Sequence, residues 1–229
     1  MARPGFADRQ RLKTWADAVP SQTEFPRLVR RLILETTPGL VELGMPAGEG
    51  VAAGGWDGTV KSTAGNTWVP EGLSVWELSV NRSPGTKADK DYAKRLATPD
   101  GSPLDACTYV EAILRPWEKR GEWAATRTAE GRWKQVKAWR LDDIDTWLET
   151  APVTWAWLSE QVGLNPYGLR SAEGWWDAWA SQTTPALTPE VVLAGRETQV
   201  TALVSRLAGA GQITSTGVKV RTSRSSMTI

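Results

Sequence analysis

The chain has 229 residues, of which 41% are hydrophobic and 23% are charged, and its formal net charge is +1. This composition is that of an ordinary globular protein with one main core. The lack of histidine and the single cysteine, Cys107, exclude Ser-His-Asp triads, histidine-ligated metal centres, disulfide frameworks and thiolate zinc clusters, so any chemistry must use Asp, Glu, Lys, Ser or Tyr.

Two helices are predicted at the start of the chain, over residues 8–19 and 25–37, because apolar residues recur there at helical spacing. In the second helix, Leu28 and Leu32 belong to the apolar stripe, and Glu35 lies at the edge of that stripe. Glu35 is therefore either an exposed carboxylate at the end of a helix or a member of a catalytic site. The sequence leaves both interpretations open.

Three strands are predicted to follow, over residues 40–45, 56–61 and 73–80. Alternation in the second strand places Asp57 and Lys61 on one face. In the third strand, Glu77 lies on the opposite face from its apolar neighbours. An isolated acid in an apolar strand costs several kcal/mol unless it is paired or bound to a metal. Glu77 is thus a candidate for function, and Asp57 is either a turn residue or the second acid of the same site.

A helix with a basic face is predicted next, over residues 86–96. Lys87, Lys90 and Lys94 recur on it at helical spacing, with Arg95 beside them. Such a stripe is by default a solvated face, but its place directly after the Glu77 strand favours contact with phosphate groups. The basic character continues, because residues 115–140 contain eight Lys or Arg and three acids.

The rest of the main domain alternates between strands and helices, which predicts an α/β fold with a central mixed β-sheet flanked by helices. The predicted elements are a strand over 109–114, a helix over 118–130, a strand over 136–139, and helices over 142–149 and 152–162. The expected organisation is a main domain over residues 1–165, a Trp- and Pro-rich cap and linker over 166–189, and a helix with a disordered basic tail over 190–229.

A helical acid, two strand acids and a lysine-bearing helix, in the order Glu35, Asp57, Glu77 and Lys87, resemble the core of the PD-(D/E)XK, or restriction-endonuclease-like, superfamily. Within it, the chain is most similar to Mrr-like nuclease modules at the amino-terminal end of large bacterial proteins, many of them antiphage defence effectors. The segments that carry this resemblance are 27–34, 55–58, 76–79, 87–95 and 145–149, and together they span about residues 8–163.

This resemblance implies an α-β-β-β-α-β core in which Asp57 and Glu77 hold Mg²⁺, or Mn²⁺ in its place, for hydrolysis of a DNA phosphodiester. Two or three carboxylates suffice for such an ion, because Mg²⁺ keeps several waters. The lysine that usually stands two residues after the Glu is replaced here by Ser79. Lys87 is the first candidate for a lysine that fills this role from another position in the sequence, and Lys61 is the second.

The segment 193–197, Leu-Ala-Gly-Arg-Glu, resembles the lead-in to a STAND-type NTPase, but no Gly-x-x-x-x-Gly-Lys-[Ser/Thr] phosphate loop follows it. We therefore expect either a truncated effector module or one whose NTPase-type partner is supplied in trans, and activation by homo-oligomerisation is a further expectation. No stretch is long and apolar enough for a signal peptide or a membrane span. With the lone cysteine, this favours a cytoplasmic protein without a membrane partner.

The leading hypothesis is a Mg²⁺-dependent deoxyribonuclease that cuts double-stranded DNA in bacterial antiphage defence. Asp57, Glu77, Lys87 and Glu35 would form its catalytic site, and Lys87, Lys90, Lys94, Arg95 and Lys61 would contact the DNA. Two alternatives remain open: a nucleic-acid-binding module of the same fold that lost catalysis through Ser79, and a protein-interaction domain of a larger defence complex that uses some of the fourteen tryptophans.

Overall fold

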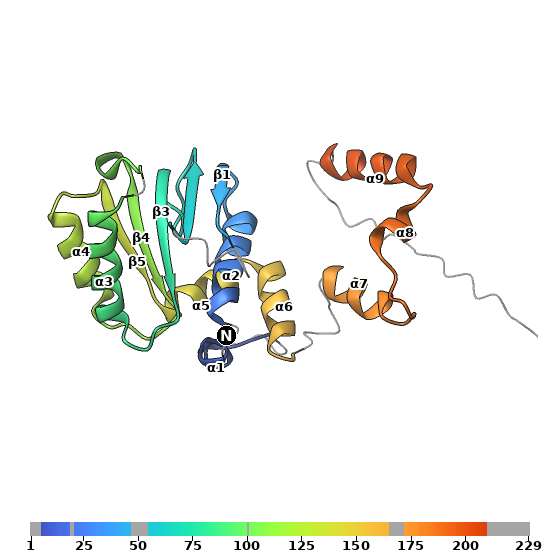
Figure 1. Ribbon diagram of the computed structural model, residues 1–229, viewed down its shortest axis with the longest axis horizontal. Helices are drawn as coiled ribbons and strands as arrows, with labels where there is room; N and C mark the ends of the chain where they lie inside the picture. Colours follow the sequence, from blue (N-terminus) through green and yellow to red (C-terminus); the bar gives the residue numbers. More distant parts are fainter. Residues whose placement is uncertain (1–5, 19–20, 47–54, 100, 165–171, 210–229) are drawn as a thin grey trace, which may run out of the picture. The chain divides into compact units, whose positions relative to one another are not determined.

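The computed structural model describes residues 6–18, 21–46, 55–99, 101–164 and 172–209. The chain forms two compact units, Met1–Trp175 and Trp176–Ile229, and Figure 1 shows the sheet of the first unit with helices on both of its faces. The α/β class and the mixed sheet flanked by helices are thus confirmed. The basic tail expected after residue 214 lies outside the described residues.

The sheet has five strands in the order β1-β2-β3-β4-β5. They are β1 (Leu40–Gly44), β2 (Gly58–Ser62), β3 (Gly72–Ser79), β4 (Thr108–Ile113) and β5 (Gln135–Trp139). Strand β2 pairs antiparallel with both β1 and β3, whereas β4 pairs parallel with both β3 and β5. Strands joined by short turns pair antiparallel, and strands separated by a crossover helix pair parallel.

One face of the sheet is covered by α1 (Arg9–Asp17), α2 (Ser21–Thr36), α5 (Leu141–Glu149) and α6 (Pro152–Gln161). The core there includes Leu32, Trp76 and Trp147, which are fully buried. The opposite face is covered by α3 (Pro84–Ala97) and α4 (Arg120–Ala129), which Figure 1 shows together on one side of the sheet. A short 3-10 helix, Leu104–Ala106, leads into β4.

Strand β3 lies in the middle of the sheet and contacts both helical layers. Val75 packs with Tyr92 and Tyr109 on the α3 side, whereas Trp76 packs on the α2 side. Since side chains alternate along a strand, Glu77 lies on the same side as Val75, beneath α3. This alternation decides which helices can reach the acid.

The tryptophans are mostly packing residues. Among the described residues, the exposed tryptophan is Trp175, at 56%. The others are buried or half-buried; the rings of Trp68 and Trp147, for example, stack with centroids 5.6 Å apart. Apart from Trp175, the tryptophans of the first unit therefore expose little indole surface.

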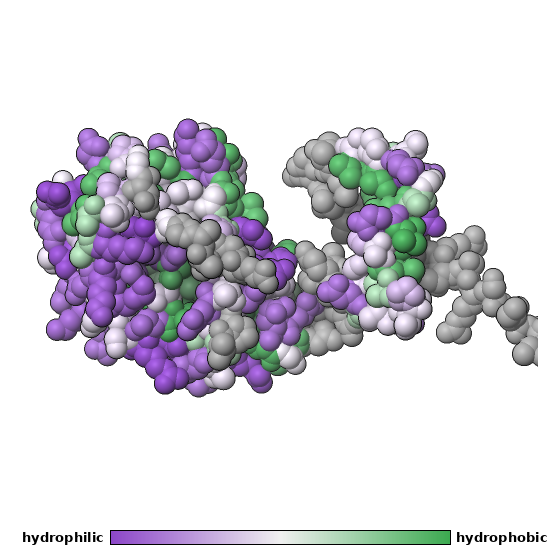
Figure 2. Space-filling view, viewed as in Figure 1, coloured by the Kyte–Doolittle hydropathy of each residue, from purple (hydrophilic) through white to green (hydrophobic). Residues whose placement is uncertain are grey.

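The helices of the C-terminal part are α7 (Ala172–Ala180), α8 (Pro189–Leu193) and α9 (Glu197–Gly209). The last of these lies in the segment 190–229, for which a helix is predicted. Hydrophobic surface is visible over this part of the chain in Figure 2, and Val191, Leu203 and Val204 are more than half exposed. None of the described helices has the length and apolarity needed to cross a membrane.

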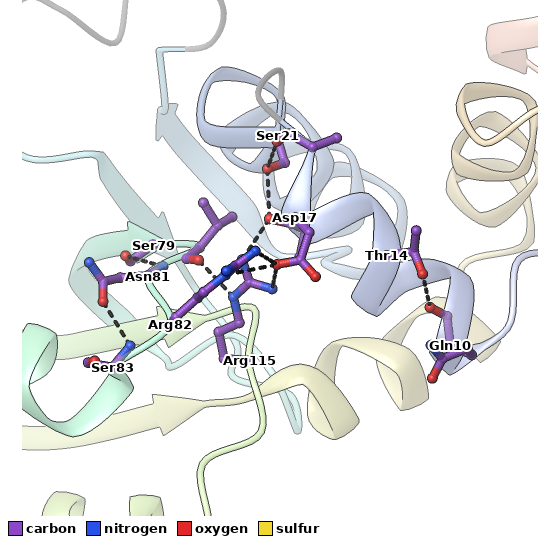
Figure 3. Close-up of polar contacts among 12 residues, drawn as sticks. Gln10, Thr14, Asp17, Ser21, Ser79, Asn81, Arg82, Ser83 and Arg115 are labelled. Carbon is purple, nitrogen blue, oxygen red and sulfur yellow. Dashed lines mark hydrogen bonds and ion pairs between the residues drawn. The ribbon is translucent and has the colours of Figure 1, made fainter.

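Arg115, directly after β4, fastens α1 to the sheet (Figure 3). Its Nε donates to the carbonyl oxygen of Val80 at 2.7 Å, and its Nη2 donates to that of Ala16 at 2.8 Å. Asp17 accepts from both Arg115 and Arg82. Arg115 is buried, with 7% exposure, so it is a structural cation and not part of the basic surface expected over residues 115–140.

Candidate active site

Two carboxylates stand side by side on the central strands. The parallel register pairs Glu77 of β3 with Glu111 of β4, and paired residues on adjacent strands share a face about 5 Å apart. Both residues are buried, with exposures of 4% and 0%. The middle of the sheet thus carries two neighbouring acids under α3.

Asp57 reaches the same place from the residue before β2. Its Oδ2 accepts a hydrogen bond from the backbone N–H of Leu78 at 2.8 Å, so its carboxylate lies against β3 beside Glu77. Burial raises the pKa of Glu77, and the charge of Asp57 raises it further, to about 7. Burial also raises the pKa of Asp57 above its usual range. The structure therefore brings together the two acids that the sequence predicted as a pair.

The turn after β3 leads into α3, and Figure 3 shows the hydrogen bonds that hold this turn. Ser79, at the position of the usual motif lysine, accepts the N–H of Asn81 at 3.1 Å, and the side chain of Asn81 accepts the N–H of Ser83 at 2.8 Å. Pro84 then begins the helix, where its fixed φ is well tolerated. Ser79 has a structural role in this turn, and Lys87 follows on the first turn of α3.

One face of α3 carries Lys87, Asp91 and Arg95 at successive spacings of four residues, which places them in a row. Lys87 Nζ donates to Asp91 Oδ1 at 2.6 Å. Arg95 forms an ion pair with Glu77 and donates to the carbonyl oxygen of Gly55. Its guanidinium also lies 4.5 Å from the ring centroid of Trp56, a distance typical of a cation–π contact.

The two acids that α3 and β4 contribute are incompletely bonded. Glu111 Oε2 accepts from the Tyr109 hydroxyl at 2.6 Å, whereas Glu111 Oε1 has no hydrogen-bond partner in the described part of the chain. Asp91 Oδ2 is likewise buried without a partner there. Burial raises the pKa of Glu111 well above its usual range, and the charges of Asp91 and Glu77 add to this.

We call the four carboxylates of Asp57, Glu77, Asp91 and Glu111 the acidic cluster. Within the part of the chain that the structure describes, Lys87 and Arg95 are the cations whose charges act on the carboxylates of Asp57, Glu77 and Glu111. Two positive charges face four negative ones when every group is ionised, so the cluster has an excess of two negative charges. Such an excess in a buried place favours uptake of protons or of a cation.

No protein-family model, curated protein or solved structure matches this chain at a significant level. The function is therefore argued from the geometry of the acidic cluster and its neighbours.

The donor set of the acidic cluster suits a hard divalent cation such as Mg²⁺, because it consists of carboxylate oxygens without nitrogen or sulfur ligands. The unpartnered oxygens of Asp91 and Glu111 are the observation that fits such an ion. Within the described ranges, no three acidic or cysteine side chains are already grouped as they would be around a metal. The Glu77 carboxylate forms an ion pair with Arg95 instead, and the Asp57 carboxylate accepts a hydrogen bond from a backbone N–H.

The remaining residues predicted for the site lie elsewhere. Glu35 accepts the N–H groups of Val153 at 2.9 Å and Thr154 at 2.8 Å, which caps the first turn of α6 on the opposite face of the sheet. Lys61 lies 3.7 Å from Glu42 on the neighbouring strand and pairs in register with β3 four residues before Glu77, about 13 Å along the strand.

The predicted DNA-binding residues of α3 differ in their exposure. Lys90 and Lys94 are exposed on α3. Arg95 is 2% exposed and bound to Glu77, so it belongs to the interior of the site. Lys87 is one-third exposed and reaches both the acidic cluster and the surface.

Sequence reasoning missed Asp91 and Glu111. Glu111 stands in an apolar strand, which is the same signal that singled out Glu77. Asp91 lies among the basic residues of α3, and helical spacing alone does not distinguish it from a solvated charge. Neither position could be assigned before the parallel pairing of β3 with β4 was known.

A cleft of about 700 Å³ opens between the start of α3, the segment after β4, and α4. Trp117, Trp123 and Arg127 are among its lining residues, and no member of the acidic cluster is. Arg127 is held there by Asp89 at 2.8 Å. We do not place the active site in this cleft, because it lacks the convergent carboxylates.

Proposed function

We propose that this chain is a metal-dependent DNA endonuclease with a restriction-endonuclease-like core, acting as the effector domain of a bacterial antiphage system. The observation that carries the proposal is the convergence of Asp57 and Glu77 at β3, with Lys87 on the helix that follows. The order α2-β1-β2-β3-α3-β4 is the order that the sequence resemblance implies, and it supports the same proposal.

The chemistry divides between a cation and the residues of the chain. A bound Mg²⁺ would polarise the phosphate and make water a better nucleophile. Asp57 and Glu77 would hold it. Lys87, partly exposed beside them, would place its ammonium group against the phosphate oxygens, where fixed positive charge stabilises the charge that develops during hydrolysis.

The exposed face of α3 would position the DNA. Lys90 and Lys94 lie one and two helical turns beyond Lys87, and both are solvent-exposed. Contacts from such lysines to phosphates fix the register of a duplex without reading its sequence. Recognition of specific bases is not part of this proposal.

A second candidate function is a nucleic-acid-binding module without catalysis. Two observations favour it: Ser79 takes the position of the motif lysine and bonds to the following turn, and Arg95 occupies Glu77. In this reading, Arg95 has taken over the place of the metal, and the lysines of α3 retain their affinity for phosphate.

The experiment incubates the purified full chain with supercoiled plasmid, linear duplex and single-stranded DNA in Mg²⁺, Mn²⁺ or EDTA. We expect cleavage that requires the cation and falls about 100-fold or more in Asp57→Asn and Glu77→Gln. Glu42→Gln, an exposed acid on β1, is the matched control. Salt-sensitive DNA binding without cleavage selects the second candidate. Absence of both binding and cleavage refutes both candidates.

A further inference from the structure

We infer that Asp91 and Glu111 are ligands of the divalent cation together with Glu77, so that the cation site is centred between α3, β3 and β4. This inference rests on the proposed function for the role of the cation in cleavage, and it adds two residues that the sequence pattern did not assign. It also changes the expected geometry, because the site then lies one strand further from Asp57.

Glu111 provides the first observation. It is fully buried in the middle of the sheet, next to Glu77, and its Tyr109 partner occupies one oxygen only. The other oxygen has no partner among the described residues. A buried carboxylate oxygen without a hydrogen bond is unusual, since nearly all buried polar atoms are bonded. The oxygen is therefore available to a ligand that is not a protein atom.

Asp91 provides the second observation, from a different element. It is 6% exposed, and Lys87 occupies its Oδ1 while Oδ2 is buried without a partner in the described ranges. The charge of Asp91 acts on Glu111 and on Glu77, so the three carboxylates lie within electrostatic reach of one another. Two unsatisfied oxygens thus come from two different elements, α3 and β4.

The charge balance points to the class of ligand. Four carboxylates against two cations leave an excess that one divalent cation would cancel. Oxygen donors alone select a hard ion such as Mg²⁺ or Mn²⁺, which needs only two or three carboxylates because waters complete its coordination. The alternative is that two protons neutralise the acidic cluster, in which case no metal would bind there.

The contacts of Lys87 give the inference a distinctive consequence. Lys87 bonds to Asp91, a proposed ligand, so its ammonium group competes with the cation for that carboxylate. Removing the ammonium should strengthen cation binding while it removes the charge proposed to act in cleavage. If Lys87 instead helped to hold the ligands of the cation in place, removing its ammonium group would weaken the affinity for the cation.

The test uses Mn²⁺ alone as the probe, with the full chain and without DNA. Free Mn²⁺ is measured by electron paramagnetic resonance at pH 7.5. We expect Glu111→Gln and Asp91→Asn each to weaken Mn²⁺ binding about 10-fold or more, and Glu42→Gln to bind like the wild type. We expect Lys87→Met to bind several-fold more tightly, since the competing charge is gone. Melting curves in EDTA verify that each variant is folded.

The outcomes separate this inference from the proposed function. If Glu77→Gln abolishes Mn²⁺ binding but Glu111→Gln and Asp91→Asn both bind like the wild type, the inference is overturned and the nuclease proposal stands. Weaker binding by Lys87→Met also overturns it, because the cation would then lie away from Asp91. If the wild-type chain binds no Mn²⁺ at millimolar concentration, the inference and the metal-dependent function both fail.

Discussion

The acidic cluster should make the folded chain less stable as pH rises through neutrality. Burial and the charge of Asp57 raise the pKa of Glu77 from 4.5 to about 7. Between these two values the folded protein binds a proton that the unfolded chain has released. Stability falls with pH wherever the folded state binds more protons, so the contribution of Glu77 is fully present below pH 4.5 and is lost as pH rises through 7.

The magnitude follows from the pKa difference. Each pKa unit corresponds to about 1.4 kcal/mol, so the rise at Glu77 corresponds to about 3 kcal/mol, most of it lost between about pH 5 and pH 8. The pKa values of Asp57 and Glu111 are raised by burial as well and act in the same direction. For a folded unit of this size, about 3 kcal/mol corresponds to a decrease of about 6–12 °C in melting temperature.

The assay is urea and thermal unfolding at pH 5, 6, 7 and 8 in EDTA, so that no divalent cation replaces the protons. We expect Glu77→Gln to reduce the slope of stability against pH, because it removes one titrating group from the acidic cluster. Glu42→Gln, which removes an exposed carboxylate, should leave the slope unchanged. Stability that stays constant or increases from pH 5 to pH 8 would refute the reasoning, since the buried carboxylates would then be ionised without cost.

Three further predictions concern residues outside the acidic cluster. Glu35→Ala should lower the free energy of unfolding by about 1 kcal/mol through loss of the α6 cap, measured by urea denaturation; loss of cleavage at unchanged stability would instead place Glu35 in the site. Arg115→Met should lower the free energy of unfolding by about 3 kcal/mol, because two backbone carbonyl oxygens lose their buried hydrogen-bond donor. Its control is Arg82→Met, which should change the urea midpoint little because the Arg82 side chain is 79% exposed. Lys90→Gln combined with Lys94→Gln should weaken DNA binding and reduce its salt slope by about one per lysine; an unchanged slope would exclude phosphate contacts.

Most of the fold could be predicted from local patterns. The predicted strand over 73–80 corresponds to β3 (Gly72–Ser79), and the predicted helix over 86–96 corresponds to α3 (Pro84–Ala97). Alternation and helical spacing determine these elements, since each reports which face is buried. Helix α2 begins at Ser21, four residues before the predicted helix over 25–37. This start was not predicted, because it depends on a contact between helices: Ser21 is buried, and its hydroxyl donates to carbonyl oxygens at the end of α1.

The candidate site could be predicted only in part, because its membership depends on which strands are neighbours. Asp57 directly precedes β2 and Glu77 lies on β3, so their convergence follows from the antiparallel pairing of these two consecutive strands. Glu111 joins them through a parallel pairing that no local pattern specifies. Glu35 illustrates the same limit, since the helix end that it caps lies 118 residues further along the chain.

The acidic cluster reduces the stability of the folded chain, and this favours a functional rather than a structural reason for its presence. A core that only had to fold would gain from apolar side chains at positions 77 and 111, because buried ion pairs seldom stabilise more than hydrophobic residues of similar size. Arg95 compensates Glu77, but the unpartnered oxygens of Asp91 and Glu111 are left without compensation in the described chain. Carboxylates held with raised pKa values and unfilled bonding positions are typical of sites where a protein binds an ion or carries out chemistry. The acidic cluster therefore lowers the stability of the fold, and this cost supports the proposal that it binds a cation.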